Sequence, residues 1–336
     1  DESESRGLGD VYKRQDQTRG WFFTMHAIAG LAFDSVAYKA VISNGLVLDK
    51  NGQKMSKRLG NAIDPFQAIN DYGADALRWY MITNSQPWDN LKFDFAGVKE
   101  IQRKFFGTLH NSYSFFSLYA NVDRFDPLAE AVSQNNLLEI DHWILSKLNS
   151  LIKEVTEKLD DFEPTKAFRP ISDFVQNELS NWYVRLCRRR FWKGEMGQDK
   201  LGAYQTLYSC LTTIAKLIAP VAPFYADQLY QDLTKTSRSV HLSDFPVSNE
   251  LKIRKDLERR MSLAQLMSSL VLSIRKKEGI RVRQPISRII IPVFSGSQEN
   301  DILAIKSLIL SEVNAKEIKL IKEDSGIFVK RGKPNF

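Results

Sequence analysis

The feature that most constrains the fold of this chain is a long region of helical periodicity. Between about residues 95 and 230, apolar side chains recur every three or four positions, which is the spacing of one face of an α-helix. The predicted helices lie, in chain order, around 101–109 and over 144–155, 164–191, 201–219 and 224–233. Because these helices are long and their connections are short, the pattern predicts a helical bundle.

A smaller mixed region follows the bundle. We expect a linker over 241–246 and a further helix over 251–277. The elements predicted after that helix are a strand over 289–294, a helix over 300–310 and short strands over 318–321 and 327–329. This order of elements indicates a small α/β unit.

The region before the bundle also mixes helix and strand signals. An apolar stretch with small residues over 21–33 predicts a helix packed on a sheet. The β-branched residues of 37–48, around Asn44 and Gly45, predict a strand, a turn and a second strand. Residues 49–52 have the Asp, Asn and Gly composition of a tight turn.

Two helix signals complete this first region. Pro65 suits the first turn of a helix, and Asp64 suits its N-cap. The sequence around Gly73 predicts the end of that helix and the start of another element. Residues 76–83 are predicted to be a helix or a strand that closes the region.

A basic loop over 54–61 has the clearest chemistry. It reads KMSKR over 54–58 and continues through Gly60 and Asn61. Two lysine ammonium groups suit a triphosphate that reacts at its α-phosphorus, because they offset the charge that builds on the phosphoryl oxygens and the leaving pyrophosphate. The alternative is a generic basic surface loop. The segment does not fit the Walker phosphate loop, which needs glycines spaced before Lys-Ser or Lys-Thr.

Residues 54–58 resemble the KMSKS signature of class I aminoacyl-tRNA synthetases. Further segments are similar to the isoleucyl enzymes of that class, namely DQTRGWF at 16–22, GLVLD at 45–49, YGADALR at 72–78, LSNWYVR at 179–185 and VRQP at 282–285. The resemblance spans residue 16 to the end of the chain. The valyl and leucyl enzymes share the lysine loop but are not expected to carry DQTRGWF.

The resemblance implies ATP-dependent activation of isoleucine to isoleucyl-adenylate and its transfer to tRNA(Ile). Lys54 and Lys57 are the implied catalytic residues, and Lys57 is the principal phosphate contact. The implied ATP-binding residues are Asp16, Lys54, Met55, Ser56 and Lys57. ATP would bring Mg²⁺ with it, and no metal site is predicted on the chain, because its four histidines are scattered without metal-ligand spacing.

Two residues are implied to bind the amino acid. Gln17 matches the family residue near its amino group, and Trp21 matches the residue that lines the side-chain pocket. A flat apolar indole suits a branched aliphatic group. The alternative for Trp21 is a core aromatic of its own helix.

Some features depart from the family pattern. Arg58 stands where the commoner bacterial enzymes have serine, and residues 11–15 lack the acidic residue and glycine that help to hold the adenylate. We therefore expect 1–15 to be a foreign or misassembled leader. The sequence shows neither a HIGH motif nor an editing insertion, so we expect a carboxy-proximal fragment that is inactive by itself.

Basic residues cluster in three places, although the formal net charge is only +7. The first cluster contains Arg185, Arg188, Arg189, Arg190 and Lys193, and the others lie over 252–260 and 275–283. Such clusters can bind nucleic-acid phosphates or can be solvated helix faces. The family's bundle holds the anticodon stem and loop, so the four arginines are the predicted tRNA contacts. Trp182 and Tyr183 lie on the apolar face, where a core role is favoured over base stacking.

The remaining features concern the compartment and the partners. Cys187 and Cys210 are too few and too far apart for a disulfide framework, so both are predicted to be buried reduced thiols, as suits the cytoplasm. No apolar run is long enough to span a membrane. The expected partners are tRNA(Ile) and isoleucine, with no membrane, and the chain is expected to be a monomer.

These observations predict a mixed fold. After the leader, residues 16–95 are expected to be the C-terminal half of an α/β Rossmann-type nucleotide fold, 96–245 an all-α anticodon-binding helical bundle, and 246–336 a small partial α/β domain at the C-terminal junction. Two alternatives remain open. The chain could belong to a valyl or leucyl enzyme, or it could be a tRNA-binding helical module without catalytic activity.

Overall fold

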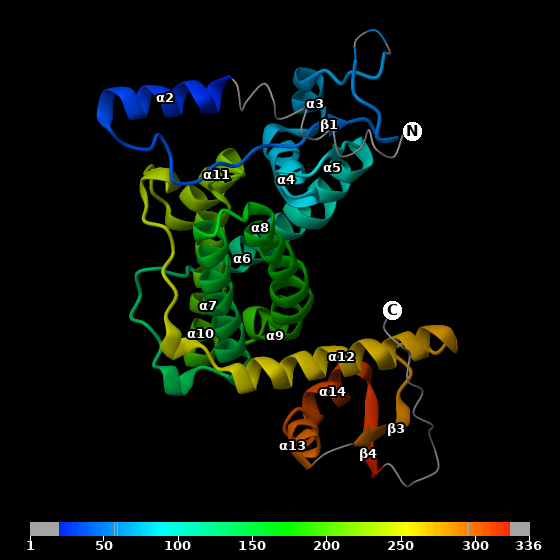
Figure 1. Ribbon diagram of the computed structural model, residues 1–336. Coiled ribbons are helices and arrows are strands. Elements are labelled where there is room, and N and C mark those ends of the chain that lie inside the picture. The colour runs from blue at the N-terminus through cyan, green and yellow to red at the C-terminus, as the bar shows by residue number, and fades with distance from the viewer. Residues whose placement is uncertain (1–19, 57, 59, 294–295, 323–336) are drawn as a thin grey trace. The chain divides into compact units, whose positions relative to one another are not determined.

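The computed structural model describes residues 20–56, 58, 60–293 and 296–322 (Figure 1). The chain forms two compact units. The first contains 1–130, 151–195 and 207–247, and the second contains 131–150, 196–206 and 248–336. The helices α7 (Glu139–Asp160) and α10 (Gln198–Ile218) each contribute residues to both units.

The first unit begins with helix α2 (Trp21–Phe33). This confirms the predicted helix, but its predicted packing on a sheet is wrong, because none of its residues is buried. Near its start, the Tyr38 hydroxyl donates to the carbonyl of Phe22 at 3.0 Å. The helix ends at Asp34, whose φ of 47° is left-handed and stops the helical hydrogen-bond pattern.

A short parallel pair of strands follows, formed by β1 (Val47–Leu48) and β2 (Leu91–Lys92). The predicted strand, turn and strand over 37–48 is therefore mostly wrong, because only its last two residues form a strand. The backbone N–H of Leu91 donates to the carbonyl of Leu46, and that of Phe93 donates to the carbonyl of Leu48, both at 2.9 Å. The segment thus pairs with a partner more than forty residues later, which local sequence signals could not reveal.

The next two helices confirm the predicted boundaries. Helix α3 (Pro65–Tyr72) begins with proline in its first turn, and the Asp64 carboxylate accepts from the backbone N–H of Phe66 at 2.9 Å. Gly73 ends α3 with a φ of 81°, a conformation that favours glycine, and α4 (Ala74–Asn84) begins directly after it. The segment predicted as a helix or a strand is therefore a helix.

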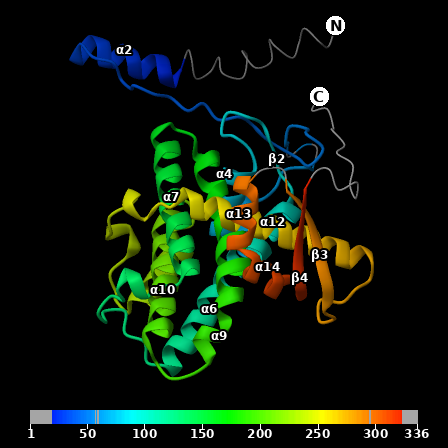
Figure 2. The ribbon, with the colours of Figure 1, turned by 90° about the horizontal axis from the view of Figure 1, so that it is seen from below.

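The helical bundle of the first unit contains most of the helical residues predicted from the apolar period (Figures 1 and 2). Its helices are α5 (Phe95–Ile101), the π-helical segment η2 (Gln102–Phe106), α6 (Gly107–Val122), residues 151–160 of α7, α8 (Pro164–Asp173), the π-helical segment η4 (Phe174–Val184), α9 (Arg185–Trp192), residues 207–218 of α10, and α11 (Pro223–Thr234). The predicted helix over 164–191 is continuous but not regular. Pro170 lies inside it and lacks a backbone N–H, and the wider π-helical turns begin four residues later.

Aromatic side chains fill the core of this unit. Trp79 of α4 is fully buried and stacks on Phe105 with ring centroids 4.3 Å apart. Its indole Nε1–H donates to the hydroxyl of Ser172 at 3.1 Å, so the buried polar group has a partner. Phe115 of α6 meets Phe191 of α9 edge to face at 5.2 Å, which joins two of the long helices.

Polar contacts tie α4 to the turn between α10 and α11. The Asp75 carboxylate accepts from the backbone N–H of Tyr225 at 2.7 Å and so caps the first turn of α11. Arg78 donates through Nε to the carbonyl of Val221 at 2.8 Å. Burial raises the pKa of Asp75, although the hydrogen bond from Tyr225 and the charge of Arg78 oppose that change.

The second unit places a short parallel sheet beside helices. Its elements are η3 (Gln134–Asn136), the N-terminal parts of α7 and α10, η6 (Glu250–Lys252), α12 (Lys255–Lys277), β3 (Ile286–Val293), α13 (Gly296–Ala304), α14 (Lys306–Val313) and β4 (Ala315–Lys322). Strands β3 and β4 pair in parallel, with Ile289 opposite Ile318. The predicted α/β unit is thus confirmed, except that the single helix over 300–310 is two helices and the strand over 327–329 lies outside the described residues.

Candidate functional site

The turn before the lysine loop is built around one carboxylate. Asp49 follows β1 directly, and its Oδ1 accepts from the backbone N–H groups of Asn51 and Gln53 at 2.9 and 2.8 Å. The backbone N–H of Gly52 donates to the Asp49 carbonyl at 2.9 Å, and Gly52 has a φ of 84°. The tight turn predicted for 49–52 is confirmed, and it reverses the chain so that Lys54 pairs antiparallel with Leu48.

The lysine loop then runs from this pairing into α3. The Lys54 side chain is exposed, and Met55 packs against the buried cluster of Ala76, Tyr80, Phe93 and Val98. Methionine therefore anchors the loop on the apolar side while the lysine beside it faces water.

Ser56 and Arg58 occupy the middle of the loop. The backbone N–H of Arg58 donates to the hydroxyl of Ser56 at 3.2 Å, and the Arg58 side chain is exposed. Lys57, the predicted principal phosphate contact, lies outside the described residues. The exposed cations of Lys54 and Arg58 fit an anionic ligand such as a phosphate chain.

Asn61 closes the loop, and its sequence context predicted no role for it. Its Oδ1 accepts from the backbone N–H of Ser56 at 2.8 Å. Its Nδ2 donates to Asp49 Oδ2 at 3.0 Å and to the Lys54 carbonyl at 3.3 Å. The hydrogen bond from Asn61, followed by that from the backbone of Gln53, lowers the pKa of Asp49. The only sequence signal was an Asn that follows a Gly at the end of a basic loop.

The predicted amino-acid site is not assembled by the described residues. Trp21 begins α2, and its side chain is 66% exposed. It is therefore neither enclosed in a pocket nor part of the core, so the alternative of a core aromatic is wrong. Asp16 and Gln17 lie outside the described residues.

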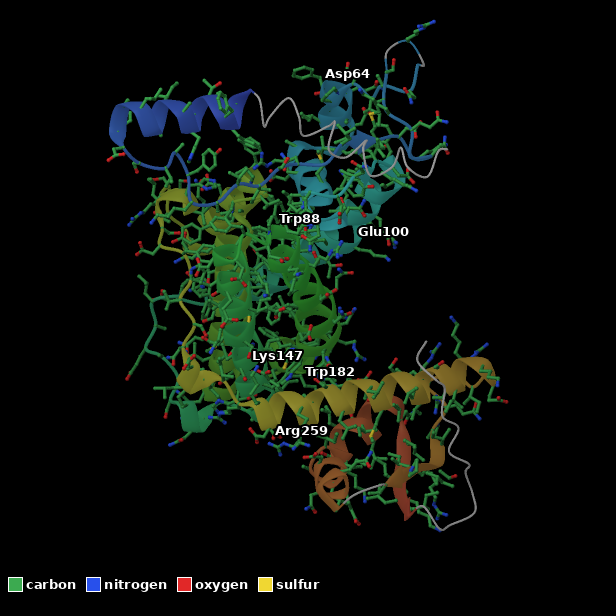
Figure 3. All side chains as sticks on the ribbon, viewed as in Figure 1. Asp64, Trp88, Glu100, Lys147, Trp182 and Arg259 are labelled. Atoms are coloured by element: carbon green, nitrogen blue, oxygen red, sulfur yellow. The ribbon has the colours of Figure 1, made fainter. Side chains whose placement is uncertain are left out.

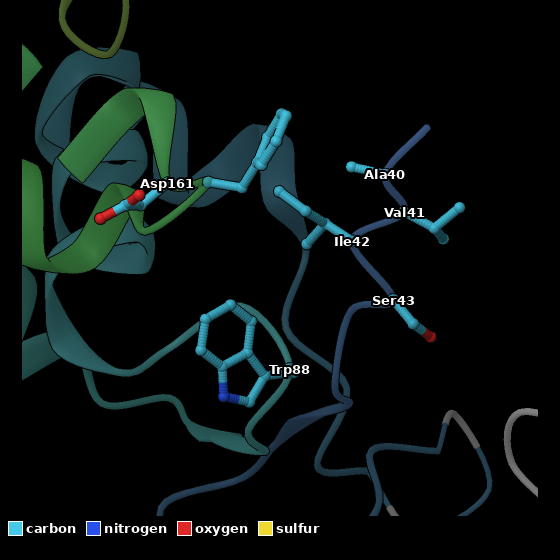
Figure 4. A pocket seen from close by; sticks show the side chains of 7 residues that line it. Ala40, Val41, Ile42, Ser43, Trp88 and Asp161 are labelled. Carbon is cyan, nitrogen blue, oxygen red and sulfur yellow. The ribbon is translucent and has the colours of Figure 1, made fainter. Parts of the chain in front are cut away.

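A pocket of 280 Å³ lies elsewhere in the first unit (Figure 4). It is lined by Ala40, Val41, Ile42, Ser43, Trp88, Asp161 and Phe162. Trp88 and the segment 40–43 face each other across it, and among its described lining residues Asp161 alone is charged. None of the predicted site residues that the structure describes lines this pocket.

The first arginine cluster lies on α9. Arg185, Arg188 and Arg189 are exposed, whereas Arg190 is half-buried with Nη1 3.6 Å from the sulfur of Cys187. The guanidinium of Arg188 lies over the ring of Phe115, 5.9 Å from its centroid. The first three arginines can therefore reach a ligand more readily than Arg190.

The aromatic residues beside this cluster belong to the core. Trp182 is 5% exposed and Tyr183 is fully buried, so the favoured core interpretation is confirmed. The guanidinium of Arg185 lies over the Trp182 ring at 5.7 Å, and its Nε donates to the carbonyl of Asn181 at 2.7 Å. Cys187 and Cys210 are buried and free of disulfide bonds, as predicted.

Three of the five basic residues of the second cluster form ion pairs within their own unit. Arg259 forms an ion pair with Asp301, and Arg260 lies 3.3 Å from Glu139 and 3.5 Å from Asp256. Lys255 contacts Glu258 at 3.1 Å. These pairs favour a structural role for the cluster over a nucleic-acid role.

The third cluster is divided between a buried and an exposed part. Arg275 is 2% exposed, and its guanidinium donates to the carbonyls of Arg281 and Gln284, which shapes the turn between α12 and β3. The other basic residues of this cluster are exposed, namely Lys276, Lys277, Arg281 and Arg283. Within the third cluster, only these four exposed residues are available to contact phosphate.

In the part of the chain that the structure describes, no group of three or more His, Cys, Asp or Glu side chains could hold a metal ion. None of the helices described is long and apolar enough to cross a lipid bilayer.

Comparison with known proteins identifies two family regions. Residues 9–94 match the family of class I tRNA synthetases for isoleucine, leucine, methionine and valine, and residues 141–291 match the anticodon-binding domain of tRNA ligases. The first match includes the lysine loop, and it also includes residues 9–15, for which a foreign leader was predicted. The second match includes α9 and its arginines.

Similar sequences extend over most of the chain. Isoleucine–tRNA ligase of Bacteroides fragilis is 62% identical over 326 residues, which is 96% of this chain and 29% of that protein. The isoleucine–tRNA ligases of Cytophaga hutchinsonii and Dehalococcoides mccartyi are 58% and 44% identical and cover 96% and 93% of the chain. The chain thus spans 29% and 31% of the lengths of these two relatives.

A solved structure shows a related fold. The Agrobacterium radiobacter LeuRS, in a ternary complex with tRNA and LeuAMS, aligns with a TM-score of 0.54 and 18% sequence identity. The alignment covers 89% of this chain and 35% of that one. At this identity the likeness concerns the fold alone.

Proposed function

This chain belongs to the isoleucine–tRNA ligases of the class I tRNA synthetases, and from that we propose that it supplies the phosphate loop and the anticodon-binding bundle of an enzyme that joins isoleucine to tRNA(Ile) with ATP. The observation that carries the proposal is the 62% identity with an isoleucine–tRNA ligase over 96% of the chain. The chain covers 29% of that relative, so the activity belongs to a protein that contains the remaining parts as well.

The proposed chemical step uses the lysine loop. The carboxylate of isoleucine attacks the α-phosphorus of ATP, the bond to the β-phosphate oxygen breaks, and pyrophosphate leaves. Lys54 is exposed on a loop whose backbone is held by Leu48 and Asn61, so its ammonium group can offset the charge on the departing phosphates. Lys57 has the same proposed role. Mg²⁺ would arrive with the phosphates, since it is usually bound largely through substrate phosphate oxygens and water.

Residues outside the lysine loop have proposed roles in binding ATP and isoleucine and in forming the domains. Asp16 contacts the ribose of ATP, Gln17 contacts the amino group of isoleucine, and Trp21 lines the pocket for its side chain. Residues 16–95 form the second half of a Rossmann-type nucleotide fold, of which the parallel pair β1–β2 is a part. Residues 96–245 and 246–336 form the bundle and the junction domain, and the cytoplasm is the proposed compartment.

The proposed tRNA contacts lie on α9. Arg185, Arg188 and Arg189 are exposed within the region that matches an anticodon-binding domain. Guanidinium groups bind phosphates through paired N–H donors and can stack on unpaired bases. Arg190 is half-buried beside Cys187, so its proposed part is smaller than that of the other three.

A segment exchange tests the catalytic proposal. The 326-residue segment of the Bacteroides fragilis enzyme is replaced by the matching residues of this chain, and isoleucine-dependent exchange between ATP and pyrophosphate is measured. We expect activity with isoleucine. Lys54→Ala should lower the rate on the order of a hundredfold, as the loss of one transition-state donor does. The control is Lys50→Ala, which removes an exposed lysine of the preceding turn.

The same exchange enzyme separates the alternatives. Activity that depended on valine or leucine in preference to isoleucine would contradict the proposal. Equal rates for the Lys54 and Lys50 variants would show that the loop handles no phosphate. If the exchange enzyme were inactive while the purified chain bound tRNA regardless of ATP, the chain would be a tRNA-binding module.

A further inference from the structure

We propose that Asp49 and Asn61 are positioning residues that hold the lysine loop in the conformation that binds phosphate. Neither residue was assigned a role by the sequence pattern, and neither carries a cation that could contact phosphate directly. The inference rests on the proposed function of the loop. Whether Asp49 and Asn61 hold the loop backbone can be tested without that function.

Asn61 joins two points of the loop to the preceding turn through one side chain. Its amide oxygen accepts from the backbone N–H of Ser56, and its amide nitrogen donates both to the carboxylate of Asp49 and to the carbonyl of Lys54. The three distances are 2.8, 3.0 and 3.3 Å. An asparagine can make this set of contacts because it carries an acceptor and two donors on one planar group.

Asp49 connects that clamp to the sheet. One of its oxygens accepts from Asn61, and the other accepts from the backbone of Asn51 and Gln53 in the turn that follows β1. These hydrogen bonds stabilise the charged carboxylate and so lower the pKa of Asp49, and hydrogen bonds to a charged acceptor are stronger than neutral ones. The end of β1 and the end of the loop are therefore held by the same side-chain pair.

Two further contacts restrain the loop together with this pair, one through the backbone and one through an apolar side chain. Lys54 pairs with Leu48, and Met55 packs on the buried cluster around Tyr80. Asn61 fixes the carbonyl of Lys54 and the N–H of Ser56, so the backbone around Met55 is held from both sides. A loop that is ordered before its ligand arrives loses less entropy on binding, which favours affinity and alignment for the reaction.

Cleavage of the loop by trypsin measures this restraint directly. The purified chain is treated with trypsin under native conditions, and the rates of cleavage after Lys54 and after Arg58 are followed by mass spectrometry. Asn61→Ala should speed both cleavages on the order of tenfold, because cleavage requires local opening and the clamp opposes opening. Asn51→Ala is the matched control, because Asp49 accepts from the backbone of Asn51, which the substitution keeps.

A reciprocal exchange of the two side chains tests whether they act as a pair. Asp49→Asn places two amide donors against each other or forces a flip, and Asn61→Asp places two carboxylates together, so both single variants should be cleaved faster than the wild type. The double variant D49N/N61D restores one donor and one acceptor and should be slower than either single variant. It should not reach the wild-type rate, because the donor to the Lys54 carbonyl is lost.

Protection by inorganic pyrophosphate separates positioning from a purely structural role. Pyrophosphate should slow cleavage of the wild-type loop, and the single variants should need several times more pyrophosphate for the same protection. Unchanged cleavage rates in the single variants, no recovery in the double variant, or unchanged pyrophosphate protection would each overturn the proposal. If pyrophosphate did not protect the wild type, the phosphate role of the loop would fail, and the rates without pyrophosphate would still show whether the pair holds it.

Discussion

Gly45 shows how one residue lets the segments that precede β1 and β2 approach each other. Its backbone N–H donates to the carbonyl of Pro87 at 2.7 Å. A Cβ atom at this position would lie 2.1 Å from the carbonyl oxygen of Asp89, which is backbone and cannot move like a flexible side chain. The glycine of the GLVLD segment is therefore required by the close approach of two chain segments, which its sequence neighbours did not indicate.

We predict that Gly45→Ala separates this pair of segments. The steric conflict should lower the free energy of unfolding by about 1–3 kcal/mol, the usual cost of inserting a carbon atom into a packed site. Urea unfolding of the purified chain measures it. Gly30→Ala is the control, because a Cβ there meets nothing within 4 Å and alanine favours the helix interior by about 0.5–1 kcal/mol. Equal effects of the two substitutions would contradict the close approach.

Aromatic residues show where residue type alone misleads. Trp182 and Trp21 are both tryptophans in apolar helical segments, yet the first is 5% exposed and the second is 66% exposed. The period of apolar residues around Trp182 identified its buried face correctly. The stretch around Trp21 is apolar on all sides, so its sequence could not show which face, if any, is covered within this chain.

At the scale of elements, a buried glutamate joins α12 to the N-terminal part of α7. Glu258 Oε1 accepts from the hydroxyls of Ser146 and Ser150, both at 2.6 Å, and Lys255 donates to Oε2 at 3.1 Å. Burial by itself would raise the pKa of Glu258, but these hydrogen bonds outweigh burial and place it below the ordinary value of 4.5. Helix α12, which carries most of the second basic cluster at its start, is thus held against α7 by the carboxylate of Glu258.

This network predicts a loss of stability in acid. A carboxyl group whose pKa is lower in the folded than in the unfolded state stabilises the fold fully above the unfolded value, and that contribution disappears as the pH falls through the folded value. The melting temperature should therefore decrease as the pH is lowered below about 4.5. Glu258→Gln should be less stable than the wild type at pH 7, and the difference should shrink between pH 5 and pH 3. A constant difference over this range would contradict the charged network.

Another element-scale contact explains the YGADALR segment. Asp75 caps α11, and Arg78 donates to the carbonyls of Val221 and Pro220, which lie more than 140 positions later. The sequence identified the segment by resemblance and predicted a helix boundary there. It could not show that the two charged residues hold a distant turn, because that partner is brought near only by the packed bundle.

At the scale of the whole molecule, tRNA binding should depend on salt through the exposed arginines of α9. Each phosphate contact by a cation releases a counterion, so the logarithm of the binding constant falls with the logarithm of the salt concentration. We predict that replacing both Arg188 and Arg189 with alanine weakens binding of tRNA(Ile) and reduces the magnitude of that slope by about 2. Filter binding at several salt concentrations measures both quantities.

Arg260→Ala serves as the control for this experiment. Its guanidinium already lies near Glu139 and Asp256, at 3.3 and 3.5 Å, so little counterion release is expected from it. Should Arg260→Ala change the slope as much as the α9 double variant, the difference drawn between exposed and paired basic clusters would be wrong. Circular dichroism of each variant shows whether the helices remain folded.

The sequence by itself determined the helices, the turn at 49–52, the cap at Asp64 and the resemblance to the isoleucyl enzymes, because each depends on residues that are neighbours in the chain. Only the tertiary structure decided that β1 pairs with β2, that Asp49 and Asn61 clamp the lysine loop, and that Arg259 and Arg260 of the second basic cluster meet Asp301 and Glu139. These contacts join residues from 12 to more than 100 positions apart. Their partners are chosen by packing and not by local propensity, so no local pattern could name them.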